Sequence, residues 1–137
     1  MSYLLDTVVI SELMKRNQNP DVMRWIDAQE SHLLFVSVVT IGEIEQGIGR
    51  LPRGDRRRAY EHMAREALPA RFAGRLLPIS IDVASSWGAF SGHYKQTLPV
   101  VDGLIAATAR VHELAVVTRN VIDFRHFDVP VINPWGN

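Results

Sequence analysis

Short runs of apolar residues alternate along the chain with longer segments in which apolar residues recur every three or four positions. Each short run has the length and continuous hydrophobicity of a strand that is covered on both faces. The sequence predicts such strands at residues 3–5, 33–36, 76–79, 114–117 and 129–132, the last of them as an edge strand.

The segments between these runs have helical spacing and carry helix-starting residues such as Pro20 and Pro99. The predicted helices span residues 7–14, a segment beginning at 20, and residues 37–50, 55–71, 82–94 and 99–111. Strands that alternate with helices favour a parallel sheet with helices on both faces. We therefore expect one α/β domain over residues 1–137.

Composition narrows the possible functions. With 47% hydrophobic and 22% charged residues, the 137-residue chain is typical of a folded protein with a proper core. Its formal net charge is zero, which gives no support to broad, sequence-independent binding of nucleic acid. Any basic surface must therefore be local.

Cysteine and targeting signals are missing from the sequence. The chain has no cysteine, which excludes disulfides and thiolate metal sites and fits a reducing compartment. No apolar run approaches the ~18 residues of a membrane helix, and the apolar start lacks the basic region and cleavage site of a signal peptide. These observations predict a cytoplasmic protein with no membrane partner.

Three acidic residues lie beside buried apolar elements. Asp6 directly follows the first predicted strand, while Glu43 and Asp102 lie near the starts of two predicted helices. A carboxylate at the carboxyl end of a strand in an open α/β sheet points into the crevice where such folds bind ligands. We expect the three acids to meet in one pocket and to hold a divalent metal.

Each acid also has a simpler interpretation. Asp6 could simply be a helix N-cap, and Asp102 could simply complement a helix dipole. Glu43 could be a solvated surface residue. As a cluster, however, carboxylates bind Mg²⁺ or Mn²⁺, which prefer oxygen ligands. Such a metal activates water and neutralises charge on a phosphate, so the cluster favours phosphodiester hydrolysis.

Residues 4–13, LLDTVVISEL, closely resemble the opening motif of PIN-domain ribonucleases of the VapC/FitB toxin type. The similarity returns in residues 37–48, 101–109, 117–124 and 131–135, in the family's order. The resemblance thus covers nearly the whole chain. It implies a PIN-like three-layer α/β/α domain with a mostly parallel central sheet.

The resemblance also implies a function: a Mg²⁺- or Mn²⁺-dependent endoribonuclease that is the toxin of a type II toxin–antitoxin pair. Its implied site residues are four acids and a polar pair: Asp6, Glu43, Asp102, Asp123, Thr118 and Asn120. The acids would bind the metal, and the polar pair would orient a ligand, the water or the phosphate. The implied partners are RNA, a second copy of the chain, and an antitoxin whose tail enters the active-site groove, with higher-order complexes of toxin and antitoxin.

Val8 departs from the family pattern, which has Asn after the Asp-Thr pair. That Asn supports the metal site from behind the ligands, and the loss of such a partner typically costs roughly 10–100-fold in metal affinity or activity. The departure implies weaker catalysis rather than a different fold. It keeps open the alternative of a PIN-fold module that binds RNA or protein with weak or no cleavage.

Two further alternatives start from a strand-end aspartate. A haloacid-dehalogenase-like phosphatase needs a second Asp two residues after the first, where this chain has Val8. A receiver-type signalling domain needs a Lys downstream of a middle-strand Asp, and the stretch after Asp102 offers none. Separately, the run from Arg53 to Arg58 is either a solvated helix start or a local phosphate-binding face.

Overall fold

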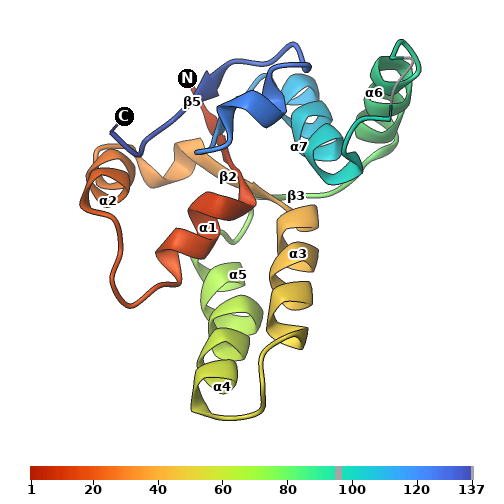
Figure 1. The fold of residues 1–137 in the computed structure, drawn as a ribbon. Helices are drawn as coiled ribbons and strands as arrows, with labels where there is room; N and C mark the ends of the chain where they lie inside the picture. The colour runs from red at the N-terminus through yellow and green to blue at the C-terminus, as the bar shows by residue number, and fades with distance from the viewer. Residues whose placement is uncertain (95–96, 137) are drawn as a thin grey trace.

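A five-stranded parallel sheet forms the centre of the computed structural model, which describes residues 1–94 and 97–136 (Figure 1). Its strands are β1 (Tyr3–Leu5), β2 (Leu34–Ser37), β3 (Leu76–Leu77), β4 (Ala115–Val117) and β5 (Val131–Ile132). They lie in the order β3-β2-β1-β4-β5, and every neighbouring pair is parallel. The predicted parallel α/β sheet is confirmed, and β5 is the predicted edge strand.

The central strand β1 fixes the place of the site. Leu5 pairs with Val117 of β4, and the Asp6 N–H then donates to the Val117 carbonyl oxygen at 2.9 Å. The chain leaves β1 toward β2 on one side, whereas β4 lies on the other side. Such a reversal of strand order opens a crevice at the carboxyl ends of the strands, where ligands bind in open α/β sheets. Asp6 stands at that point.

Helices cover both faces of the sheet (Figure 1). They are α1 (Thr7–Leu13), α2 (Pro20–Asp27), α3 (Val38–Gly49), α4 (Asp55–His62), α5 (Leu68–Arg71), α6 (Ile81–Ser91) and α7 (Val100–Val111). Helices α1 to α5 pack on the face that carries Leu5, and α6 and α7 pack on the face that carries Leu4. Successive strand residues point to opposite faces, so these two leucines divide the core into two clusters and create three layers.

The segment 55–71 is helical as predicted but differs in two ways. A π-helical turn, Met63–Ala67, joins α4 to α5. The segment also contributes to the core, although its many charged residues indicate a surface helix. Ala64 and Leu68, together with the following Phe72, are buried in the core cluster. Their spacing of four residues places them on one helix face, and the neighbouring arginines hide this stripe in the sequence.

Short 3₁₀ turns at Ser31–Leu33 and Val121–Phe124 complete the fold. In the part of the chain that the structure describes, no helix has the length and apolar character needed to cross a membrane.

Candidate active site

Hydrogen bonds from Thr7 and Thr118 hold the Asp6 carboxylate in place. Its Oδ1 accepts a hydrogen bond from the Thr7 N–H at 2.8 Å, which confirms the predicted N-cap of α1. Its Oδ2 accepts from the Thr118 hydroxyl at 2.7 Å, and that hydroxyl accepts from the Asn120 N–H at 3.0 Å. A hydroxyl has one proton to donate, and Thr118 donates it to the Asp6 carboxylate. Its observed contact is therefore with an acid of the site, and the predicted contact with a ligand stays a prediction.

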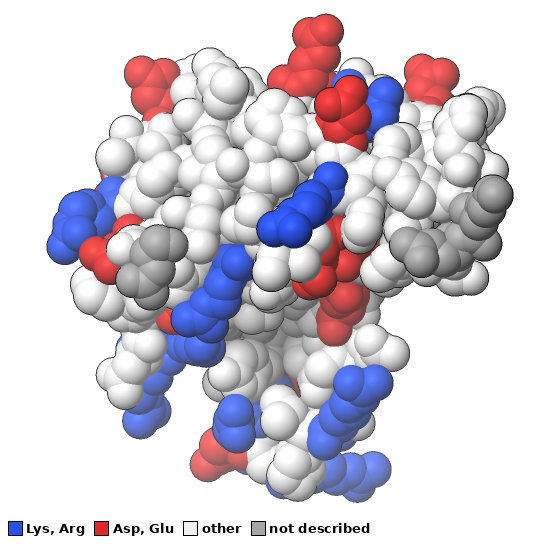
Figure 2. All heavy atoms as spheres, turned by 45° about the horizontal axis from the view of Figure 1, so that its top comes forward, with Lys and Arg blue, Asp and Glu red and all other residues white. Residues whose placement is uncertain are grey.

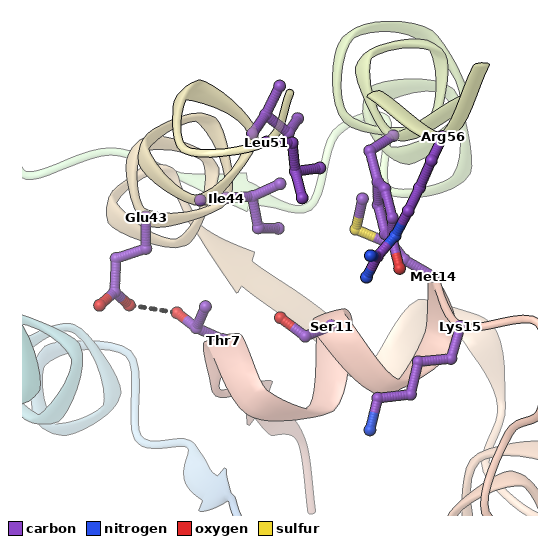
Figure 3. A pocket seen from close by; sticks show the side chains of 11 residues that line it. Thr7, Ser11, Met14, Lys15, Glu43, Ile44, Leu51 and Arg56 are labelled. Atoms are coloured by element: carbon purple, nitrogen blue, oxygen red, sulfur yellow. Dashed lines mark hydrogen bonds between the residues drawn. The ribbon is translucent and has the colours of Figure 1, made fainter. Parts of the chain in front are cut away.

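Glu43 reaches the site from α3. Ser37 caps this helix by accepting from the Val39 N–H at 3.1 Å, so α3 begins directly where β2 ends. The Thr7 hydroxyl donates to Glu43 Oε1 (Figure 3). It also lies 3.0 Å from the hydroxyl of Thr40. One oxygen of Glu43 is thus fixed against α1.

Asp102 and Asp123 approach from the other side of β1. Asp102 lies in the first turn of α7 and is partly buried. Asp123 is exposed on the 3₁₀ turn after β4, where its N–H donates to the Asn120 carbonyl oxygen at 3.1 Å. The short connection after β4 therefore carries Thr118, Asn120 and Asp123 together to the carboxyl edge of the sheet.

Two of the four acids, Asp6 and Asp102, have raised pKa values. Burial, followed by the charges of Asp6, Asp123 and Glu43, raises the pKa of Asp102 to about 6. Burial also raises the pKa of Asp6 against the opposing effect of its hydrogen bonds, and Glu43 and Asp123 add to that rise. Figure 2 shows acidic side chains gathered in the middle of one face of the molecule. The structure thus brings all four predicted acids into one electrostatic neighbourhood.

A hard divalent cation matches the chemistry of this donor set. All four side chains offer carboxylate oxygens, and a cation would stabilise the ionised forms of Asp6 and Asp102, whose pKa is raised by burial and by the neighbouring carboxylates. Among residues 1–94 and 97–136, however, no group of three or more histidine, aspartate or glutamate side chains is arranged to hold a metal ion. Both Asp6 oxygens and one Glu43 oxygen are occupied by hydrogen bonds instead.

A groove runs from Glu43 along α1, α3 and α4 (Figure 3). It encloses about 240 Å³, with Thr7 and Glu43 at one end and Lys15 and Arg56 among its other lining residues. Apolar side chains supply much of its lining: Met14, Ile44, Ile48, Leu51 and Tyr60. The site therefore opens into an elongated, largely apolar groove that also carries cationic side chains.

The arginine run divides in the structure. Arg57 donates to the Leu51 carbonyl oxygen at 3.0 Å and so holds the connection between α3 and α4, whereas Arg58 pairs with Asp55 within the first turn of α4. Arg56 instead lines the groove and lies 5.7 Å from the centre of the Tyr60 ring. Of these three arginines, Arg56 is the one that borders the groove.

The sequence did not indicate a role for two residues near the acids, Thr7 and Thr40. Thr7 and Thr40 contact each other beside Glu43, although no motif spacing assigns them a role. The available signal was that Thr7 follows Asp6 and Thr40 lies one helical turn before Glu43. Val8 packs against the core cluster around Leu5, and its effect on catalysis stays a prediction.

The family model described as "PIN domain" matches residues 3–130. The chain therefore belongs to the PIN-domain family. It is 39% identical over 136 residues to "VapC ribonuclease Y4jK" of Sinorhizobium fredii, covering 96% of each chain. It is 34% identical over 135 residues to "Toxin FitB" of Neisseria gonorrhoeae, covering 96% of this chain and 97% of FitB. Within the PIN domains it thus belongs to the VapC/FitB toxins, which confirms the resemblance.

Solved structures agree with this assignment. The crystal structure of FitAcB from Neisseria gonorrhoeae superposes with a TM-score of 0.89 and 33% identity, covering 98% of this chain and 99% of that chain. A toxin–antitoxin complex from Klebsiella pneumoniae contains a chain with a TM-score of 0.73 and 28% identity, and the match covers 97% and 98% of the two chains. These similarities confirm the PIN-like α/β fold that was predicted.

Proposed function

We propose that the chain is a Mg²⁺- or Mn²⁺-dependent endoribonuclease and the toxin of a type II toxin–antitoxin pair. The observation that carries the proposal is the group of four carboxyl groups, Asp6, Glu43, Asp102 and Asp123, beside the end of β1, where burial and the neighbouring acids raise the pKa of Asp6 and of Asp102. The relationship to a VapC ribonuclease supplies the substrate class, RNA. Residues 1–137 would act as one PIN domain.

The four acids would hold the cation, which when bound supplies an activated water and neutralises charge on the phosphate. The chain itself contributes orientation and desolvation. Thr118 and the N–H of Thr7 fix the two oxygens of Asp6, whose side chain is buried with 4% of its surface exposed. Asp102, whose pKa is about 6, must lose its proton before it can act as a ligand. Binding and activity should therefore increase as the pH rises through this value.

We further propose that an antitoxin tail occupies the groove beside the acids. Its apolar lining suits buried side chains of a peptide, and Glu43 at its end would favour a cationic group. The related toxin–antitoxin complex supports this kind of partner. Since RNA is the proposed substrate, the cytoplasm is the proposed place of action.

A homodimer is also proposed, and assemblies with the antitoxin would build on it. Large aliphatic side chains remain exposed where several elements begin near the carboxyl edge of the sheet. Ile81 at the start of α6 is 85% exposed, Val100 at the start of α7 is 51% exposed, and Ile122 after β4 is 68% exposed. A contiguous apolar surface marks a protein interface, and in the proposed dimer the second copy would cover these side chains.

The test is cleavage of structured and single-stranded RNA by protein freed of any antitoxin, in Mn²⁺, in Mg²⁺ and in EDTA. Asp102→Asn should lower the metal-dependent rate by more than about 100-fold, because removing a metal ligand reduces activity more than removing one of the groups that support the ligands. Asp82→Asn is the matched control, since Asp82 occupies the first turn of α6 and is exposed. Cleavage that survives EDTA and Asp102→Asn would contradict the proposal. RNA binding without any metal-dependent cleavage would favour the binding-module alternative.

A further inference from the structure

Two threonine hydroxyls form a chain that ends on Glu43. Thr7 Oγ1 lies 3.0 Å from Thr40 Oγ1 and donates to Glu43 Oε1. A hydroxyl carries one proton, and an ionised carboxylate can only accept. Because Thr7 gives its proton to Glu43, Thr40 must be the donor in the contact between the two threonines. The direction of the chain is therefore Thr40 to Thr7 to Glu43.

The position of Thr40 in its helix explains why its hydroxyl is free for this contact. In mid-helix a threonine hydroxyl commonly donates to the carbonyl of the preceding turn, as Thr108 does to the Leu104 carbonyl oxygen at 2.7 Å. Thr40 is the third residue of α3, and the residue four positions earlier, Val36, belongs to β2. Its hydroxyl turns instead to Thr7, the first residue of α1.

We infer that Thr40 and Thr7 form a hydroxyl relay that positions the Glu43 carboxylate to receive the divalent cation. This inference rests on the proposed function, because it gives the relay the task of presenting a ligand. Thr7 holds one oxygen of Glu43, and the other oxygen points away from Thr7 (Figure 3). Glutamate has three rotatable side-chain bonds, so holding one oxygen restricts where the other can lie. Thr40 is fully buried and acts only through Thr7, which makes it a positioning residue.

The relay also strengthens its own last bond. A hydrogen bond to an ionised acceptor is stronger than one between neutral groups. When Thr40 donates to Thr7, it polarises the Thr7 hydroxyl and makes it a better donor to Glu43. Removing the Thr40 hydroxyl should therefore loosen Glu43 even though Thr40 does not touch it.

The test measures Mn²⁺ affinity by titration calorimetry without RNA, together with kcat and KM for RNA cleavage. Thr40→Val keeps the side-chain shape but removes the hydroxyl, and it should weaken Mn²⁺ binding and lower kcat by roughly tenfold. KM for RNA should change by less than about twofold, since Thr40 is fully buried and cannot contact the substrate. Thr40→Ser retains the hydroxyl and should restore most of the Mn²⁺ affinity.

Thr108→Val is the matched control, because it removes the hydroxyl of another fully buried helical threonine that lies outside the relay. Its Mn²⁺ affinity should equal that of the wild type whatever its thermal stability. Thr7→Val provides a second route that does not disturb a fully buried position, and it should cost at least as much as Thr40→Val. The double variant should lose no more than Thr7→Val, because both hydroxyls act on one carboxylate.

An unchanged Mn²⁺ affinity in Thr40→Val, or additive losses in the double variant, would overturn the relay. If Asp102→Asn abolishes Mn²⁺ binding while Thr40→Val binds as the wild type does, only the relay fails. If the wild type itself binds no Mn²⁺, the proposed metal-dependent function fails, and the relay fails with it.

Discussion

The pKa of Asp102 ties the stability of this chain to its proposed chemistry. Burial and three neighbouring carboxylates raise this pKa to about 6, so the folded protein without a cation holds the Asp102 proton more tightly than the unfolded chain does. A raised pKa contributes stability at low pH that is lost as the pH rises through the folded value. The same repulsion would favour cation binding. At this position stability and metal binding therefore oppose each other.

We predict that Asp102→Asn removes part of the pH dependence of folding. In EDTA, the free energy of unfolding of the wild type should fall by roughly 2 kcal/mol relative to the variant between about pH 4 and pH 6.5. Urea unfolding at several pH values measures this difference, with Asp82→Asn as the control. Parallel pH profiles for the wild type and Asp102→Asn would show that Asp102 has an ordinary pKa.

At the scale of elements, the packing of α6 against α7 sets the position of Asp102. Gly103 is buried next to Asp102, and an added Cβ would lie 2.9 Å from Trp87 Cδ1 and 3.0 Å from Trp87 Nε1. The absence of a side chain at position 103 thus allows the first turn of α7 to approach α6 closely. This contact positions a predicted metal ligand from outside the acidic cluster.

Gly103→Ala should therefore separate α7 from α6 or displace Trp87. Overpacking of this kind typically costs 1–3 kcal/mol, and we expect a loss of about 2 kcal/mol together with weaker Mn²⁺ binding through a shifted Asp102. Gly88→Ala in α6 is the control, because nothing lies within 4 Å of its added Cβ. That change should stabilise the helix by up to ~1 kcal/mol. Thermal unfolding and calorimetry of both variants provide the comparison, and equal stabilities would contradict the close-packing argument.

At the scale of the whole molecule, a net charge of zero leaves RNA binding dependent on local cations. Arg56 and Lys15 line the groove that begins at Glu43, so they are placed to meet phosphates beside the site. Arg57 donates to the Leu51 carbonyl oxygen and Arg58 pairs with Asp55 in α4, so changing either would remove a contact within the fold as well as a surface charge. Arg56 is therefore the sharper test of the phosphate-binding interpretation.

Arg56→Glu should weaken RNA binding and reduce the slope of log affinity against log salt by about 1, because one phosphate contact is lost. Arg24→Glu is the control, since Arg24 pairs with Asp21 in α2, outside the residues that line the groove. Binding should be measured in EDTA at several salt concentrations. The same slope in Arg56→Glu and the wild type would favour the solvated-helix interpretation of the arginine run.

The sequence by itself determined the order and type of the elements, because hydrophobic periodicity is a local property. The runs at 3–5 and 114–117 predicted β1 and β4 within a residue of their observed bounds, and the motif of residues 4–13 identified the family. Asp6 could be placed at the end of β1 because a strand end and a helix start meet there in the sequence. The catalytic roles of the acids remain predictions.

Only the tertiary structure decided how the site is held. Thr118 and Asp6 are 112 residues apart, and Thr7 and Glu43 are 36 apart, yet each pair shares a hydrogen bond. Sequence spacing cannot reveal such partners, because a hydroxyl can donate to any acceptor that the folded chain brings within about 3 Å. The raised pKa of Asp102 has the same origin. It depends on burial and on distances to Asp6, Glu43 and Asp123, which exist only once the sheet has brought its carboxyl ends together.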